Sequence, residues 1–377
     1  MTYDAIVLGL GGMGAAATAV LARRGLRVLA FDRYQRGHAL GSSQGHTRII
    51  RTAYYEAADY VPLCRAAFSG WYDLEQRTGQ HLVTACECLT IGQPSGALIQ
   101  GVQTAATLHG LNLAPLDPAT LRNRFPQFRF GDDYVGAIES EAGFLYVDDC
   151  VRALQDDALA HRAELRFAEQ VLEWKVVGDT VAVRTAWETV SAARLVIAAG
   201  AWTKKTLDGL ELPLTIMRQV PQWFRPANAE AFRRDRFPIF MAEVPEGHFY
   251  GVPMLDPRGM KIAQHYGAPE LPCVKEARYD VTPEDEKPIR RFLSEHLPDV
   301  TGPRTSASVC LYTLTPDRHF IIDRHPEYPQ VAIAGGFSGH GFKFAPVVGE
   351  ILADLVTKSE TAYPVGMFRV GRFDKKN

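Results

Sequence analysis

The sequence has almost no net charge and no long apolar run. Its 41 Lys and Arg nearly balance 43 Asp and Glu, so charge gives no general reason to bind nucleic acid or an anionic membrane. No apolar run approaches the ~18–20 residues that are needed to span a bilayer. The first residues lack the pattern of a signal peptide, and residues 374–377 do not form a peroxisomal signal. We therefore expect a cytoplasmic protein.

Cysteine is also scarce. The 377 residues contain six cysteines, which do not have the pattern of a disulfide framework. Cys86 and Cys88 lie two residues apart, but in an extended segment their side chains point to opposite faces. No second pair of Cys or His lies at the spacing of a zinc site. The sequence therefore predicts no metal centre.

The N-terminal segment contains the clearest motif. Residues 5–8 form a nearly all-apolar run, as expected of a strand in a parallel sheet. The turn that follows, residues 9–14, fits G-x-G-x-x-G with one additional glycine, and residues 15–24 have the pattern of a helix. Residues 26–31 form a second apolar strand that ends at Asp32. This order of elements predicts a dinucleotide-binding unit.

Each part of that motif has a physical role. Gly9 permits the tight turn, Gly11 allows a pyrophosphate to approach the backbone, and Gly14 lets the helix pack on the strand. The helix N-terminus offers N–H donors to the phosphates, and Asp32 can accept a hydrogen bond from a ribose hydroxyl. The motif alone does not distinguish NAD from FAD.

Three cations lie in apolar surroundings. Arg48 and Arg51 are three residues apart in the stretch 47–51, and Lys343 lies between two phenylalanines. One interpretation is that these side chains extend along the surface to reach water. The other is a buried anion site, because a desolvated cation needs a carboxylate or phosphate partner.

The rest of the chain suggests two domains, as its length also does. Residues 240–244, 249–254 and 261–265 mix aromatic and polar positions, as in an antiparallel sheet with one face towards a cavity. An apolar strand at 330–334 then enters a second glycine-rich turn, residues 335–344. Both ends of the chain are therefore expected to build one cofactor domain.

Taken together, these segments resemble the monomeric sarcosine oxidase family. This family includes N-methyltryptophan oxidase and belongs to the glycine/D-amino-acid oxidase superfamily of flavoproteins. The resemblance covers essentially the whole chain. Besides residues 9–14, it rests on TRIIR at 47–51, YVPL at 60–63, MK at 260–261, VCLYT at 309–313, FIID at 320–323 and GFSGHGFKF at 336–344.

The resemblance implies an α/β fold with a Rossmann-like FAD-binding domain and an α+β substrate domain. The FAD-binding domain would comprise residues 1–85, 145–213 and 314–377. The substrate domain, with a mainly antiparallel sheet, would comprise 86–144 and 214–313. The flavin ring would be attached covalently through Cys310, which requires a thiolate that the nearby cation Arg48 would favour.

The resemblance also implies the reaction, which is the oxidation of a secondary amino acid such as sarcosine. Hydride passes from the carbon next to the amine to the flavin, the imine hydrolyses, and the reduced flavin converts O₂ to hydrogen peroxide. The small-molecule substrate and O₂ are the expected partners, and the protein is expected to be a monomer.

Individual residues acquire expected roles by matching the motifs of that family. The implied catalytic residues are Lys261, which would stabilise developing superoxide, Arg48, His265 and Tyr312. Arg51 and Lys343 would hold the substrate carboxylate, while Tyr250 and Met241 would line the pocket. The residues implied to bind the cofactor are Gly9, Gly11, Gly12, Met13, Gly14, Asp32, Arg33, Ser42, Thr47, Arg48, Val171, Gly200, Trp202, Cys310, Gly339, Gly341, Phe342 and Lys343.

Three positions depart from the pattern of the family. Gln44 replaces an active-site histidine, and His46 replaces an acidic residue. Tyr55 stands where relatives have glycine, and the sequence does not decide whether its side chain narrows the pocket or points outward. These departures leave the choice of amino acid open.

Other activities therefore remain as alternatives. Within the same enzyme class, the chain fits an oxidase or dehydrogenase of cyclic amino acids such as L-pipecolate or proline, although Lys261 favours an oxidase. Outside that class, it fits a flavin-binding subunit without catalysis of its own, or an NAD-dependent dehydrogenase.

Overall fold

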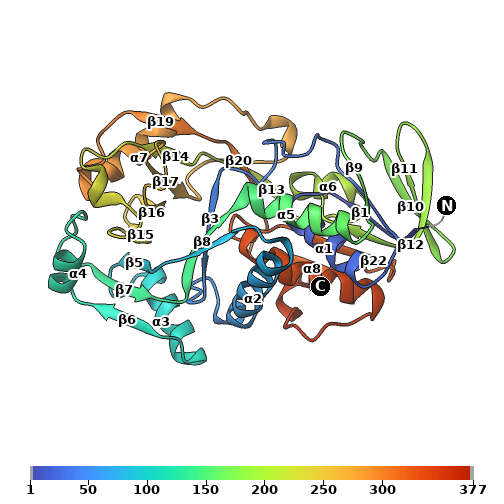
Figure 1. Cartoon of the computed structure of the whole chain (residues 1–377), viewed down its shortest axis with the longest axis horizontal. Helices are drawn as coiled ribbons and strands as arrows, with labels where there is room; N and C mark the ends of the chain where they lie inside the picture. Colours follow the sequence, from blue (N-terminus) through green and yellow to red (C-terminus); the bar gives the residue numbers. More distant parts are fainter. Residues whose placement is uncertain (1–2, 374–377) are drawn as a thin grey trace.

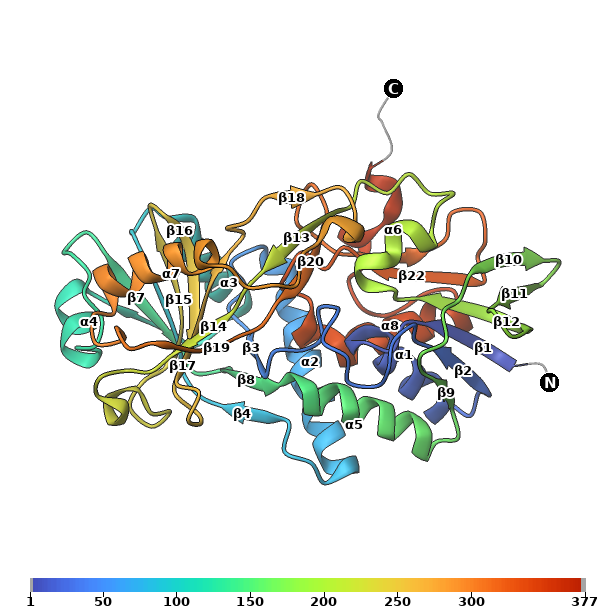
Figure 2. The same cartoon turned by 90° about the horizontal axis from the view of Figure 1, so that it is seen from above.

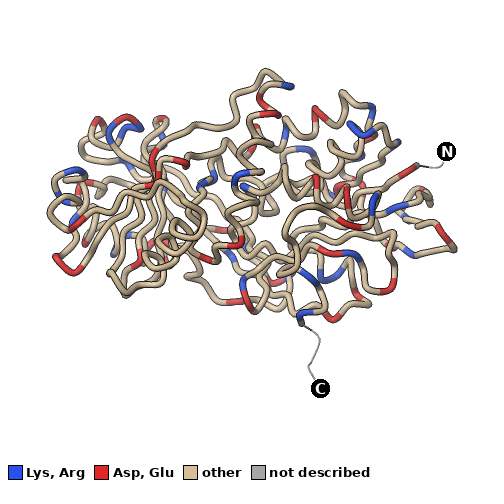
Figure 3. The backbone as a smooth tube through the Cα atoms, turned by 90° about the horizontal axis from the view of Figure 1, so that it is seen from below, with Lys and Arg blue, Asp and Glu red and all other residues tan. Residues whose placement is uncertain are grey.

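The structure is a computed structural model that describes residues 3–373. Residues 374–377, where the sequence predicts no peroxisomal signal, lie outside this range. Among the described residues, no helix is long and apolar enough to cross a membrane. Basic and acidic residues are interspersed along the chain (Figure 3).

The first of two large sheets draws its strands from both ends and the middle of the chain. Its eight strands are β1 (Tyr3–Leu8), β2 (Val28–Phe31), β9 (Glu164–Arg166), β10 (Glu173–Val177), β11 (Thr180–Arg184), β12 (Thr189–Ile197), β21 (Ile321–Arg324) and β22 (Val331–Gly335). The order β9-β2-β1-β12-β22 is parallel throughout. β10, β11 and β21 join antiparallel.

Helices cover one face of this sheet. They are α1 (Gly12–Arg23), α2 (Val61–Thr78), α5 (Val147–Ala160) and α8 (Ala345–Thr357), whereas the short α6 (Thr203–Thr206) lies at the other face, where the next residue, Leu207, packs with Ile6 and Leu8. Ala5 and Val7 of β1 pack into a core with α1 and α8. Ile6 and Leu8 point the other way, towards β11. Because both faces of β1 are buried, its sequence is a continuous apolar run.

The second large sheet is mainly antiparallel. Its eight strands are β5 (Cys88–Gly92), β6 (Leu113–Leu116), β7 (Val135–Glu139), β14 (Gln222–Phe224), β15 (Ile239–Val244), β16 (Gly247–Val252), β17 (Met260–His265) and β19 (Arg304–Ala307). Only β5 and β15 pair in parallel among these strands. Three helices pack against this sheet: α3 (Ala97–His109) contacts β5, α4 (Pro118–Arg124) contacts β7, and α7 (Pro283–His296) contacts β17.

Two small sheets lie between the large ones. One contains β3 (Thr47–Arg51), β4 (Val83–Ala85) and β8 (Ala142–Tyr146), and the other β13 (Thr215–Gln219), β18 (Glu270–Leu271) and β20 (Cys310–Leu314). In both views, the first large sheet with α1 and α8 lies at one end of the molecule, and the second with α4 and α7 at the other (Figures 1 and 2). β3 and β20 therefore carry side chains to the junction.

The predicted mixed α/β class is confirmed, whereas the domain boundaries remain a prediction. Two helices differ from their sequence patterns. The sequence predicts a helix around residues 103–109, and α3 begins six residues earlier, at Ala97. The sequence predicts a helix over roughly residues 283–297 that Pro288 kinks or restarts, whereas α7 continues through Pro288, its sixth residue, although proline has no N–H to donate to the Glu284 carbonyl.

The close packing of α1 on α8 gives a stability test. A Cβ added to Gly349 of α8 would lie 2.7 Å from the carbonyl carbon of Ala16 in α1, so Gly349→Ala must push the helices apart. We expect the free energy of unfolding to fall by about 1–3 kcal/mol, measured by urea denaturation. Gly366→Ala is the control, because nothing lies within 4 Å of its added Cβ. Equal stability of both variants would contradict the close packing.

Candidate functional site

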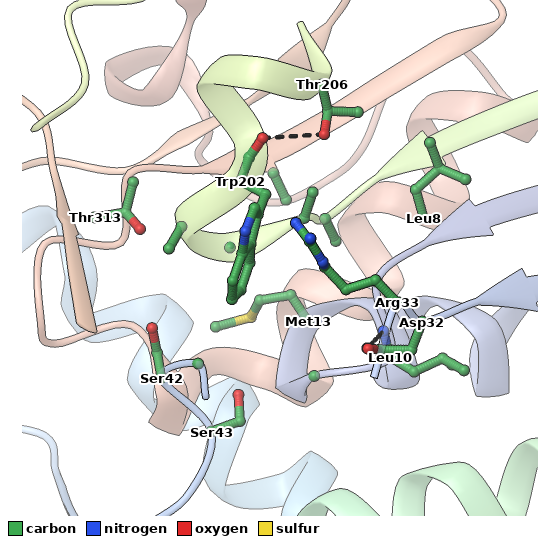
Figure 4. Close-up of a pocket in the computed structure, with 18 of the residues that line it drawn as sticks. Leu8, Leu10, Met13, Asp32, Arg33, Ser42, Ser43, Trp202, Thr206 and Thr313 are labelled. Carbon is green, nitrogen blue, oxygen red and sulfur yellow. Dashed lines mark hydrogen bonds between the residues drawn. The ribbon is translucent and has the colours of Figure 1, made fainter. Parts of the chain in front are cut away.

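A cavity of about 760 Å³ lies at the carboxyl ends of β1, β2, β12 and β22. Ligands of open α/β sheets bind at this edge, and the volume is in the range of cofactor sites. Figure 4 shows Met13, Asp32, Arg33 and Trp202 from different segments around it.

The glycine turn forms one wall of this cavity. Gly9 has φ +97°, and a Cβ there would lie 2.4 Å from the Ala198 carbonyl oxygen. A Cβ on Gly14 would lie 1.8 Å from the carbonyl oxygen of Gly9, so Gly14 serves helix packing. Gly11 precedes α1 without a side-chain cap, and the first-turn amides are therefore donors for an anion.

Asp32 also stabilises this turn. Its Oδ2 accepts a hydrogen bond from the Leu10 amide at 2.9 Å (Figure 4), and its Oδ1 accepts one from the Tyr34 amide at 2.9 Å. Each carboxylate oxygen can accept more than one hydrogen bond, so Asp32 can still receive a ribose hydroxyl. Arg33 lies beside the same wall, with its guanidinium carbon 5.1 Å from the centroid of the Trp202 ring.

A smaller cavity of about 100 Å³ adjoins the first one. Arg48, Tyr312, Gly339 and Phe342 line both cavities, which places the junction beside β3 and β20. The residues predicted to bind substrate all line the smaller cavity: Arg51, Lys343, Tyr250 and Met241.

The second sheet presents three of the predicted residues on one face. Met241 of β15 pairs with Tyr250 of β16, and His265 of β17 lies opposite His248. The alternate positions Phe240 and Phe249 pack into the core with α7. Strand periodicity thus separates an aromatic core face from a polar cavity face.

Cys310 lies in the wall of the smaller cavity with two hydrogen-bond donors at its sulfur. Gln44 Nε2 lies 3.1 Å and Arg48 Nη2 3.3 Å from Cys310 Sγ. Gln44 Nε2 also donates to the Val309 carbonyl, and Gln44 Oε1 accepts from Ser308. The residue in place of the expected histidine therefore fixes the segment that carries Cys310.

Arg51 and Lys343 are both buried, and each has partners. Arg51 Nη2 forms an ion pair with Glu56 Oε2 at 2.6 Å. Burial raises the pKa of Glu56, but Arg51, His340 and Lys343 outweigh it and bring the pKa to about 2. Lys343 Nζ donates to the His340 carbonyl at 2.7 Å. Burial and the charge of Arg51 lower the pKa of Lys343 to about 8.

His265 lies next to the hydroxyl group of Tyr312. The distance from His265 Nδ1 to Tyr312 Oη is 3.2 Å. Burial lowers the pKa of His265 to about 3, so the ring is neutral at pH 7. It therefore adds a hydrogen-bonding group to the cavity but no charge.

Lys261 shares the cavity face of β17 with His265 but does not line either cavity. Its side chain is 2% exposed, and Nζ donates to the carbonyls of Gly45 at 2.9 Å and Thr47 at 2.7 Å. Burial and Arg48 lower the pKa of Lys261 well below its usual value. Thr47 Oγ1, 3.3 Å away, is a third acceptor, and these three oxygens oppose that shift by stabilising the ammonium form.

Most predicted site residues line one of the two cavities. The exceptions are the buried residues Gly14, Thr47 and Lys261, which are not among the lining residues of either cavity. The sequence did not predict Glu56, His248 and Leu98, which also line the smaller cavity. Only His248 had a usable signal, because it lies two residues before Tyr250 and thus on the same face of β16.

Comparisons with known proteins identify the family. A family model described as FAD dependent oxidoreductase matches residues 4–355. The chain belongs to this family of FAD-dependent oxidoreductases.

Individual relatives span nearly the whole chain of this FAD-dependent oxidoreductase. It is 38% identical over 374 residues to monomeric sarcosine oxidase of Bacillus sp. strain NS-129, covering 98% of this chain and 97% of that protein. It is 33% identical over 377 residues to N-methyl-L-tryptophan oxidase of Salmonella enteritidis PT4, with 100% of each covered. The solved structure of NikD, an unusual amino acid oxidase essential for nikkomycin biosynthesis, has a TM-score of 0.86 at 26% identity, covering 98% of this chain and 97% of that one.

The predicted family and FAD as cofactor are thus confirmed, and the large cavity fits that cofactor. It combines a glycine turn that side chains would block with an uncapped helix N-terminus for phosphates. Gly12 is also restricted, because a Cβ there would lie 3.0 Å from the ring of Phe342.

The structure shows where the side chains lie at the other two positions that depart from the family pattern, Tyr55 and His46. Tyr55 lines the smaller cavity, so its side chain narrows the pocket. His46 has φ +71° and lies outside both cavities, with Nε2 3.3 Å from Asp256 Oδ2.

Glu139 holds the backbone that directly follows Arg51. It is 2% exposed, and its Oε1 accepts hydrogen bonds from the amides of Thr52 and Ala53, while Oε2 has no hydrogen-bond partner among the described residues. Burial raises the pKa of Glu139 from 4.5 to about 7, against the opposing charge of Arg51. The protonated form is therefore favoured by folding.

This shift predicts a pH dependence of stability. A raised folded-state pKa gives stability that is present below pH 4.5 and is lost as the pH rises through 7. From pH 5 to 8, the wild type should lose about 2.5 kcal/mol of unfolding free energy relative to Glu139→Gln, because glutamine stays neutral and can accept the same amide hydrogen bonds. Urea denaturation at each pH measures the difference, and parallel profiles would contradict the assignment.

Proposed function

We propose that this FAD-dependent oxidoreductase oxidises secondary N-methyl amino acids such as sarcosine and reduces O₂ to H₂O₂. The observation that carries the proposal is the small cavity, which the cations Arg51 and Lys343 line together with Cys310 and Tyr312. The names of the sarcosine and N-methyltryptophan oxidases among its relatives support the same substrate class.

The two cations fit the carboxylate of an amino acid. Arg51 offers a planar donor group and Lys343 a point charge. Glu56 already pairs with Arg51 at 2.6 Å, so an incoming carboxylate competes with Glu56 for the guanidinium group. Displacing Glu56 would leave its buried carboxylate without this partner, so the substrate carboxylate shares the five guanidinium N–H donors with Glu56 and binds Lys343 as well.

Three other residues that line the cavity, His265, Tyr312 and Met241, suit the amine. His265 is neutral at pH 7 because burial lowers its pKa to about 3, so it does not repel a cationic amine. Tyr312 Oη lies 3.2 Å from His265 Nδ1, and the phenol can donate its proton to that nitrogen or orient a substrate. Met241 adds an apolar surface.

FAD, when bound, accepts hydride from the carbon next to the amine and delivers two electrons to O₂. We propose a thioether between the cofactor and Cys310, whose thiolate the donors Gln44 and Arg48 would stabilise. Lys261 would supply the positive charge that favours O₂ reduction, because three oxygen acceptors hold its ammonium group. As its relatives' names suggest, we propose a monomer, and we propose a cytoplasmic location.

The covalent link has a direct test. Acid-precipitated wild type should keep its yellow flavin in the pellet and show a fluorescent band on a denaturing gel, whereas Cys310→Ser should release all flavin to the supernatant. Cys273→Ser is the matched control and should keep the flavin, because Cys273 lies outside both cavities. Flavin that remains in the Cys310→Ser pellet would assign the anchor to another residue.

The reaction is tested by peroxide release from purified protein in air. Sarcosine, other N-methyl amino acids, L-pipecolate and L-proline are compared, and we expect the sarcosine or N-methyl amino acids to give peroxide at the highest kcat/KM. Bleaching of the flavin without peroxide would instead identify a dehydrogenase. A flavin that none of these compounds reduces would indicate a non-catalytic subunit.

A further inference from the structure

An aromatic side chain, Tyr55, lines the smaller cavity beside Arg51 and His248, and we call this part of the lining the Tyr55 end. The ring of Tyr55 lies 5.0 Å from the guanidinium carbon of Arg51 and 6.0 Å from the ring of His248, which it meets edge-on. Both Tyr55 and His248 line the cavity. The Tyr55 ring therefore lies next to both Arg51, the cation proposed to bind the substrate carboxylate, and His248.

A series of side-chain contacts connects the Tyr55 end of the cavity to the neighbouring elements. His248 Nε2 lies 3.6 Å from Glu243 Oε1, and Glu243 Oε2 accepts a hydrogen bond from the Leu98 amide at 2.8 Å. Leu98 belongs to the first turn of α3 and also lines the cavity. These contacts connect β15, which carries Glu243, with β16, which carries His248, and with α3.

The backbone of Tyr55 is packed closely against α3. A Cβ added to Gly101 of α3 would lie 2.5 Å from the carbonyl oxygen and 2.7 Å from the Cα of Tyr55. Helix α3 therefore packs directly against this residue, and only the absence of a side chain at Gly101 permits the approach. The space that a larger substrate needs must come from the Tyr55 side chain itself.

We propose that Tyr55 sets the size limit of the substrate. With its ring in place, the cavity of about 100 Å³ is well below the ~300 Å³ of ordinary ligand pockets and takes amino acids with little or no side chain, such as sarcosine. Without the ring, the end of the cavity opens towards His248 and α3 and takes aromatic side chains. This inference rests on the proposed function, because it names the substrate size within that class.

The experiment compares ratios, because loss of the ring also loosens Arg51 and so weakens every carboxylate alike. In Tyr55→Ala, the preference for sarcosine over N-methyl-L-phenylalanine, as a ratio of kcat/KM, should fall at least ~10-fold. Tyr55→Phe is the matched control, which keeps the ring and should keep the wild-type ratio. An unchanged ratio in Tyr55→Ala would overturn the proposal.

Binding gives a second readout that does not depend on turnover. The dissociation constants of acetate and phenylacetate are measured from the change in flavin absorption, and the preference for acetate should fall by a similar factor in Tyr55→Ala. If the wild type oxidises no secondary amino acid, the proposed function fails, while this ratio still tests the size limit. Should Tyr55→Ala fail to fold, Tyr55→Leu, which has a smaller side chain, should move both ratios in the same direction, and unchanged ratios would overturn the proposal.

Discussion

The site depends on how buried positive charge is balanced. Arg51, Lys261 and Lys343 are each almost inaccessible to water, and a buried cation without partners is very costly. Arg51 pairs with Glu56, while Lys261 and Lys343 donate to backbone carbonyls. Carbonyl acceptors stabilise these cations without neutralising them, so the cavity keeps a positive potential for an anionic ligand.

The position of these cations follows from the two small sheets at the junction. β3 carries Arg48 and Arg51, and β20 carries Cys310 and Tyr312. Each strand therefore contributes one residue near the end of the cofactor cavity and another in the substrate cavity. Neither large sheet alone contains the complete site, which explains why the discontinuous segments of the chain must fold together before it forms.

Much of the fold was predictable because its signals are local. The glycine turn and its flanking strands have a fixed spacing, and strand periodicity places Lys261 and His265 on one face of β17. The start of α3 was not predictable, because helix ends are the least defined part of a helical pattern. The continuity of α7 through Pro288 was not predictable either, because proline in a helix interior usually kinks or ends the helix. Glu56, in a loop, and Glu139, the last residue of β7, carried no local signal either, since acidic residues are usually exposed.

The sequence by itself determined the family and, through the resemblance to that family, the cofactor and the expected roles of the cationic residues, because the matching motifs are local runs of residues. The spacing of the glycine turn alone indicated only a dinucleotide. Only the tertiary structure decided that Glu56 pairs with Arg51, that Gln44 contacts Cys310, and that the Tyr55 ring points into the cavity. These contacts join residues from different elements, or depend on the direction of a side chain in a loop. Both are set by packing, such as the approach of α3 at Gly101, and not by local sequence.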